Sequence, residues 1–126
     1  MADIVVVEDN TDLRQIIAHI LTKAGHSVTE ASDGSEILEI LAKQPADLVL
    51  TDIVMPNQEG IQTIVQMRRY YPHLKIIGMS SGGSEGDSHY LEMAREFGAN
   101  ATLAKPFPKA KLLETVETLL DAVASA

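Results

Sequence analysis

A short apolar run that ends in an acidic residue constrains this chain more than any other stretch. Leu48, Val49 and Leu50 are consecutive, a pattern typical of a strand buried on both faces of a parallel sheet. Pro56 cannot donate to a strand ladder and disfavours helix just before it, so this strand ends earlier. Asp52 therefore lies at the carboxyl end of the strand, where open α/β sheets bind ligands. By itself, Asp52 is about equally well explained as a nucleophile or metal ligand and as a helix-capping or loop aspartate.

Strands and helices alternate along the whole chain. Apolar, β-branched runs predict five strands, at 4–7, 26–31, 48–52, 75–79 and 101–104. Apolar residues at helical spacing predict five helices, the first capped by Asn10 or Thr11 and ended by Gly25, the second capped by Ser35. This alternation implies a single α/β domain over 1–126, a flavodoxin-like doubly wound parallel sheet in the order 2-1-3-4-5. The residues expected to face the core include Leu13, Ile16, Ile17, Ile20, Leu21, Val28, Ile61, Ile64, Val65, Met67, Leu91, Ala94, Phe97, Leu112 and Val116.

Composition excludes several classes of function. The 126 residues carry a net charge of −8, which argues against direct nucleic-acid or anionic-membrane binding. No apolar run is long enough to span a membrane, and the first residues carry no basic segment of a signal peptide. The absence of cysteine excludes disulfides and thiolate chemistry and is compatible with a cytoplasmic location.

Polar residues follow four of the five predicted strands, and the predicted order brings them to one edge of the sheet. Strands one and three are neighbours in that order, so Glu8 and Asp9 are expected to lie beside Asp52. Ser80 and Lys105 follow the fourth and fifth strands. Three carboxylates in one pocket repel each other, and a hard divalent cation with oxygen ligands, Mg²⁺ or Mn²⁺, relieves that repulsion.

The same set of groups predicts phosphoryl-transfer chemistry. A free carboxylate can attack phosphorus while a metal ion and a lysine neutralise the charge that develops. Asp52 is the candidate nucleophile, Lys105 the candidate cation facing the anion, and Ser80 the candidate hydroxyl donor. Taken singly, each has a simpler reading: Glu8 and Asp9 could favour a helix N-terminus, Ser80 could be a turn hydroxyl, and Lys105 a solvated lysine.

With these residues in this order, the chain resembles the receiver domain of two-component response regulators across essentially its whole length. The matching motifs are Glu8-Asp9, Asp52 with Met55-Pro56, Ser80, and Lys105-Pro106-Phe107. The resemblance implies that Asp52 is the phospho-acceptor, that Glu8, Asp9 and the backbone carbonyl of Val54 join it in binding Mg²⁺, that Ser80 is the hydroxyl switch residue, and that Lys105 senses the phosphate. It also implies a cis Lys105-Pro106 bond.

Two features depart from the family pattern. The family usually has an aromatic switch residue in strand five, and the matching position here is Thr102, which leaves the coupled movement of hydroxyl and ring absent or altered. The Gly/Ser-rich segment 82–88 is longer and more glycine-rich than expected for the family, and it is predicted to be a mobile loop that orders on phosphorylation. Elsewhere, Arg68-Arg69 is interpreted as a solvated helix end, Tyr70-Tyr71 as packing residues, and none of the four histidines as catalytic or metal-binding.

The predicted function is therefore signalling rather than turnover of a substrate. The resemblance implies a histidine kinase or histidine phosphotransfer protein as the donor, a downstream protein or an output domain outside these residues, and a family-typical dimer face formed by the fourth helix, fifth strand and fifth helix. A rival function is that of an aspartate-nucleophile phosphohydrolase, which generally has a second acid two residues after the nucleophile, where this chain has Val54. A second rival is a flavin-binding module, whose phosphate Glu8-Asp9 would repel, and a third is a degenerate, phosphorylation-independent receiver.

Overall fold

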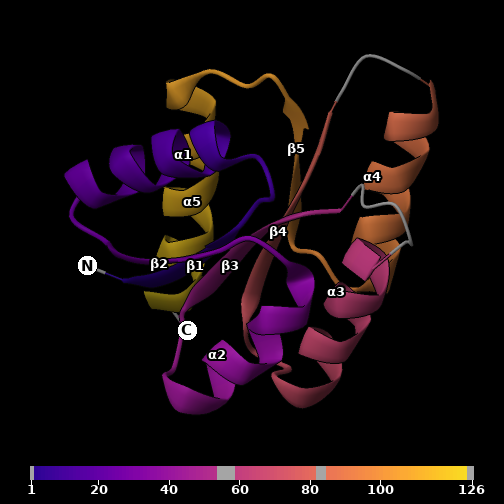
Figure 1. Ribbon diagram of the computed structural model, residues 1–126, viewed down its shortest axis with the longest axis horizontal. Helices are drawn as coiled ribbons and strands as arrows, with labels where there is room; N and C mark the ends of the chain where they lie inside the picture. Colours follow the sequence, from indigo (N-terminus) through magenta and orange to yellow (C-terminus); the bar gives the residue numbers. More distant parts are fainter. Residues whose placement is uncertain (1, 54–58, 82–84, 125–126) are drawn as a thin grey trace.

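Five parallel strands form one sheet with helices on both faces (Figure 1). The computed structural model describes residues 2–53, 59–81 and 85–124. The strands are β1 (Asp3–Val7), β2 (Ser27–Ala31), β3 (Leu48–Asp52), β4 (Lys75–Ser81) and β5 (Ala101–Lys105), and the helices are α1 (Thr11–Lys23), α2 (Ile37–Lys43), α3 (Glu59–Tyr70), α4 (Glu85–Phe97) and α5 (Lys109–Ala124), with a 3₁₀ turn η1 (Gly34–Glu36) before α2. The strand order is β2-β1-β3-β4-β5, as the sequence predicts.

The two faces of the sheet bury different helices, because successive strand residues point to opposite sides. In β1, Ile4 and Val6 belong to a buried cluster with residues of α1 and α5. Val5 and Val7 belong to a second cluster with residues of α2, α3 and α4. Figure 1 shows the same division, with α1 and α5 on one side of the sheet and α2, α3 and α4 on the other. Strands buried on both faces explain the unbroken apolar runs of β1 and β3.

Three apolar helix residues predicted to face the core are exposed instead. Ile16 is 57%, Val65 40% and Phe97 45% exposed. Ile16 and Val65 each adjoin a fully packed isoleucine in the sequence, and neighbouring helix positions are turned by about 100° relative to each other, so both cannot face the sheet. Phe97 is the last residue of α4.

Helix ends follow the predicted capping chemistry at α1 but not at α2. Asn10 Oδ1 accepts a hydrogen bond from Leu13 N at 3.0 Å, which confirms Asn10 as the cap of α1. Gly25 follows the helix with φ +100°, the left-handed conformation that glycine adopts without strain. The prediction that Ser35 caps the second helix is wrong, because Asp33 Oδ1 accepts from Ser35 N and opens η1, and α2 starts only at Ile37.

Two further details, the burial of β2 and the start of α4, differ from the sequence prediction. In β2 the buried residue is Ala31, whereas Val28 is only partly buried, because β2 is a strand at the edge of the sheet. Helix α4 begins at Glu85, so the second half of the predicted loop 82–88 is helical, and residues 82–84 lie outside the described ranges. Over the parts of the chain that are described, no helix is both long and apolar enough to cross a membrane.

Candidate functional site

Strand register brings two of the predicted acidic residues to one level of the sheet. Val7, the last residue of β1, pairs with Thr51 of β3. Glu8 directly follows Val7, and Asp52 directly follows Thr51. Strand alternation directs both side chains toward the face that carries α1 and α5. Lys105 at the end of β5 shares that face, since Leu103, two residues earlier, packs in the same cluster. The register alone therefore places three charged groups together.

The side-chain geometry agrees with this placement. Carboxylate oxygens of Glu8, Asp9 and Asp52 lie within 4.8 Å of one another. Lys105 Nζ donates to Glu8 Oε2 at 2.6 Å and lies 3.4 Å from Asp52 Oδ2. Glu8 is 2% and Asp52 7% exposed, whereas Asp9 is exposed. We call Glu8, Asp9 and Asp52 the acidic trio; the lysine bridges its two buried members.

Burial and charge act in opposite directions on Glu8. Desolvation, the largest effect, raises the pKa of the Glu8 carboxyl above its usual range, and the nearby charge of Asp52 raises it further. The hydrogen bond and the charge of Lys105, together with the backbone N–H of Asn10, lower it. The trio has three carboxylates, and the single charge of Lys105 cannot compensate all of them. An additional cation would be favourable there.

Ser80 lies at the carboxyl end of β4 and is fully buried. Within the described residues its hydroxyl oxygen has no hydrogen-bond partner. A buried hydroxyl without a partner is uncommon, since leaving it unpaired costs about 1–3 kcal/mol. Ser80 alternates with Met79, which packs toward α1 and α5, so Ser80 faces the α4 side of the sheet. Its position near the end of β4 is as predicted.

Two predicted features lie outside the described residues, and one backbone prediction is confirmed. Val54, with its predicted metal-binding carbonyl, and the Met55-Pro56 motif fall in the segment 54–58. The Lys105-Pro106 peptide bond is cis, as the resemblance implied.

Sequence patterns missed two polar residues with several partners. Arg68 was interpreted as a solvated helix end, but its guanidinium bonds oxygens of Pro72, Leu74, Gly98 and Asn100. His26 is buried; its Nδ1 accepts from Ala2 N at 3.2 Å, and its Nε2 lies 2.8 Å from Glu117 Oε1. Most of these partners are distant in sequence, and no local spacing reveals them.

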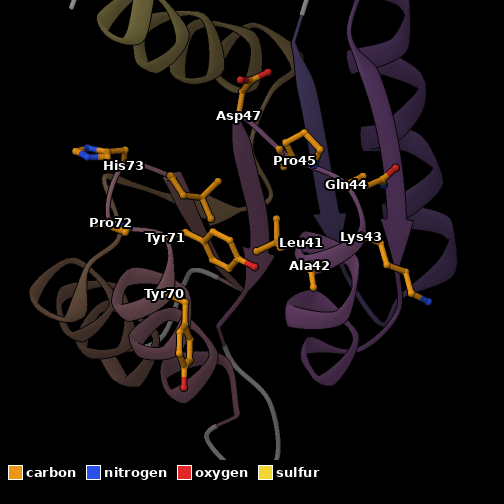
Figure 2. A pocket seen from close by; sticks show the side chains of 12 residues that line it. Leu41, Ala42, Lys43, Gln44, Pro45, Asp47, Tyr70, Tyr71, Pro72 and His73 are labelled. Atoms are coloured by element: carbon orange, nitrogen blue, oxygen red, sulfur yellow. The ribbon is translucent and has the colours of Figure 1, made fainter.

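A hollow of about 620 Å³ lies at the opposite end of the sheet from the acidic trio. It is lined by the loops that lead into β3 and β4, so it belongs to the amino ends of the strands. Figure 2 shows Tyr71 and Leu41 facing each other across it, while Tyr70 points away. Its lining is largely apolar, and it holds none of the predicted site residues. This hollow and the acidic trio are therefore separate.

Thr102 stands beside a groove on the face formed by α4, β5 and α5. Its strand partner is Gly78, and strand alternation places Thr102 and Ser80 on the same side of the sheet. The groove has a volume of about 320 Å³ and is lined by Thr102 together with Arg95 and Lys111 among others. Thr102 thus borders open space at the surface.

We expect Thr102→Tyr to change the free energy of unfolding by less than about 1 kcal/mol, because the larger ring can enter this groove. Leu103→Tyr is the matched control: Leu103 is 2% exposed, and overpacking there should lower the free energy of unfolding by about 1–3 kcal/mol. Urea titrations of both variants measure the difference. Equal destabilisation by the two substitutions would contradict an open groove at position 102.

Comparison with known proteins agrees with this geometry. The sequence profile of the response regulator receiver domain matches residues 4–117. The probable chemotaxis protein CheY of Rhizobium etli is 31% identical, over 95% of this chain and 93% of that protein. The response regulator receiver protein CpdR of Brucella abortus is 34% identical, over 97% of this chain and 99% of that protein. Some relatives are much longer, and this chain spans only 16–28% of several of them.

A solved structure gives the same answer for the fold. The chemotaxis protein CheY4 of Vibrio cholerae superposes with a TM-score of 0.83 at 29% identity, covering 94% of this chain and 98% of that one. A five-stranded parallel sheet in the order β2-β1-β3-β4-β5 with helices on both faces defines the CheY-like class of flavodoxin folds. Within that class, this chain belongs to the receiver domains of two-component response regulators.

Proposed function

We propose that this chain is a phospho-accepting receiver that takes a phosphoryl group onto Asp52 with the help of Mg²⁺ and signals through a changed partner-binding surface. The observation that carries the proposal is the convergence of the acidic trio around Lys105, with Lys105 Nζ 2.6 Å from Glu8 Oε2 and 3.4 Å from Asp52 Oδ2. A nucleophilic carboxylate, its cationic neighbour and two further carboxylates stand together at the ligand-binding edge of the sheet.

The donor set fits a hard divalent cation. All the candidate ligand atoms are carboxylate oxygens, which Mg²⁺ prefers, and two of the three residues are buried. Glu8, Asp9 and Asp52 would hold the ion, and the carbonyl of Val54 is proposed as a further ligand. When bound, the ion supplies positive charge that stabilises the oxygens of a transferring phosphoryl group.

The side chains of Asp52, Lys105 and Ser80 are proposed to carry out the other parts of phosphoryl transfer. A carboxylate oxygen of Asp52 forms a bond to phosphorus while the bond from phosphorus to the donor breaks. With a phosphohistidine donor, the imidazole nitrogen keeps the bonding electrons; with acetyl phosphate, acetate leaves with them. Lys105 supplies a point charge for a phosphoryl oxygen, and the Ser80 hydroxyl, at the end of the adjacent strand β4, is proposed to donate to another. Attack of water on the phosphorus later restores Asp52 and releases phosphate.

The rival functions explain fewer of the observations. A phosphohydrolase generally needs a second acid two residues after its nucleophile, and Val54 cannot serve. A degenerate receiver has no need of three converging carboxylates. Two of them are buried, although their negative charges repel each other. Receiver domains interact with histidine kinases or phosphotransfer proteins, and we propose such a protein as the donor here. The groove beside Thr102 on the α4-β5-α5 face is the proposed site at which a partner, or a second copy of the chain, senses the change.

Intact-protein mass spectrometry after incubation with acetyl phosphate tests the proposal. We expect one phosphoryl adduct in the presence of Mg²⁺, none after chelation, and none in Asp52→Asn under either condition. Glu92→Gln removes an exposed carboxylate on α4 and should be modified like the wild type. Circular dichroism confirms that each variant is folded. An adduct on folded Asp52→Asn, or a wild-type protein that neither binds Mg²⁺ nor accepts phosphate from acetyl phosphate or a phosphohistidine protein, would refute the proposed function.

A further inference from the structure

Arg14, in the first turns of α1, makes two contacts next to the acidic trio. Its Nη1 donates to the backbone carbonyl of Glu8 at 2.8 Å. Its Nε lies 3.2 Å from Glu30 Oε1, and its side chain is only 15% exposed. A charge-assisted bond to a backbone carbonyl, combined with an ion pair to β2, fixes the guanidinium in one orientation.

The bonded carbonyl belongs to the peptide group that joins Glu8 to Asp9. The orientation of that peptide group sets the direction in which both carboxylates leave the backbone. Neighbouring groups are also tied: Glu8 N donates to Ala31 O at 3.0 Å, and Asn10 N donates to Glu8 Oε1 at 3.3 Å. Arg14 therefore holds the middle of a short segment whose two ends are held by β2 and by the cap of α1.

The contribution of this arrangement to stability is small, because a partly exposed ion pair is worth about 0–1 kcal/mol. As a charge, a cation beside the trio would weaken the binding of another cation. Glu30 offsets this, since its carboxylate pairs with the guanidinium and cancels most of its charge. The Arg14–Glu30 pair thus supplies direction to the Glu8–Asp9 peptide group with little net charge.

We propose that Arg14, oriented by Glu30, is a positioning residue for cation binding by Glu8 and Asp9. The inference rests on the proposed function, because it presupposes that the trio binds Mg²⁺. Groups that orient metal ligands typically change metal affinity by about 10–100-fold when they are removed. Arg14 acts on the ligands through the backbone rather than by touching the ion.

Isothermal titration of Mg²⁺ into the full chain separates positioning from charge. We expect Arg14→Lys and Arg14→Gln both to bind Mg²⁺ about tenfold more weakly than the wild type. The lysine keeps the charge but cannot make both contacts. If Arg14 acted only as a charge, Arg14→Lys would bind normally and Arg14→Gln more tightly. Glu30→Gln should also weaken binding, while Arg69→Gln, which neutralises an exposed arginine of α3, should not.

Amide hydrogen exchange in metal-free protein gives an independent readout. We expect the Asp9 and Asn10 amides to exchange faster in Arg14→Lys than in the wild type or Arg69→Gln, with the core strands unchanged. Wild-type Mg²⁺ affinity in both Arg14 variants, or unchanged exchange at Asp9 and Asn10, would overturn the positioning role while leaving the proposed function intact. A wild-type protein that binds no Mg²⁺ would overturn both.

Discussion

Replacing Arg68 with alanine is expected to lower the free energy of unfolding by about 3 kcal/mol, a large effect for a side chain that is only partly buried. The guanidinium donates twice to Gly98 O, at 3.1 and 2.7 Å, to Leu74 O at 2.7 Å, to Pro72 O at 2.9 Å and to Asn100 Oδ1 at 2.8 Å. These bonds join the end of α3 to the segments that lead into β4 and β5. Burial lowers the pKa of Arg68, but an arginine remains charged at neutral pH.

Alanine would remove the donor that these acceptors share, and its methyl group cannot replace the planar fork. Arg68→Lys keeps the charge yet can make only part of the bonds, so an intermediate loss is expected. Arg69→Ala, at the next and exposed position, should change the free energy of unfolding by less than about 0.5 kcal/mol. Urea titrations with unchanged slopes measure all three. Equal effects of the Arg68 and Arg69 substitutions would contradict this role.

Gly98 belongs to the same junction. Its φ of +132° is a conformation that side chains rarely adopt, and a Cβ there would meet Arg68 Cβ and Cγ at 3.1 Å. The sequence does not predict that this glycine lets Arg68 reach the backbone, because that pairing spans 30 residues of chain.

What the sequence does predict is the sheet and the charged residues at the carboxyl ends of its strands. Apolar runs locate β1, β3 and β4, and right-handed crossovers leave the order β2-β1-β3-β4-β5 as the favoured one. Once that order is assumed, Glu8, Asp52 and Lys105 must end at the same edge, since each directly follows or ends a strand. The acidic trio could therefore be predicted from strand ends alone, without any side-chain coordinates.

Which helix residues are exposed, and which polar side chains contact each other across the fold, depends on tertiary structure that local sequence patterns do not encode. Helical spacing marks an apolar stripe, but the sheet covers only part of it, so Ile16 and Val65 lie exposed at its margins. Arg14 bonds a carbonyl 6 positions away, and His26 contacts a carboxylate 91 positions away. The chemistry of these side chains alone is compatible with solvation, and only the assembled fold reveals what they hold.

Mg²⁺ is expected to stabilise the wild-type protein strongly, because a ligand that binds only the folded state adds to the free energy of unfolding. For one ion per chain, the gain above the dissociation constant is about 1.4 kcal/mol for each tenfold rise in Mg²⁺, reaching about 2.7 kcal/mol at 100 times that constant. The acidic trio supplies the physical reason, since three carboxylates within 4.8 Å of one another are held together in the fold and separate on unfolding. Urea titrations over a range of Mg²⁺ concentrations measure the slope.

Controls must separate site binding from general screening, because the chain carries a net charge of −8. Ionic strength is therefore held constant with NaCl. Asp9→Asn and Asp52→Asn each remove one carboxylate of the trio and should flatten the dependence, whereas Glu92→Gln, which removes an exposed carboxylate on α4, should keep the wild-type slope. A slope near twice the expected value would indicate a second ion. The same slope in the wild type and in Asp52→Asn would mean that Mg²⁺ acts on the net charge of the protein and not at the trio.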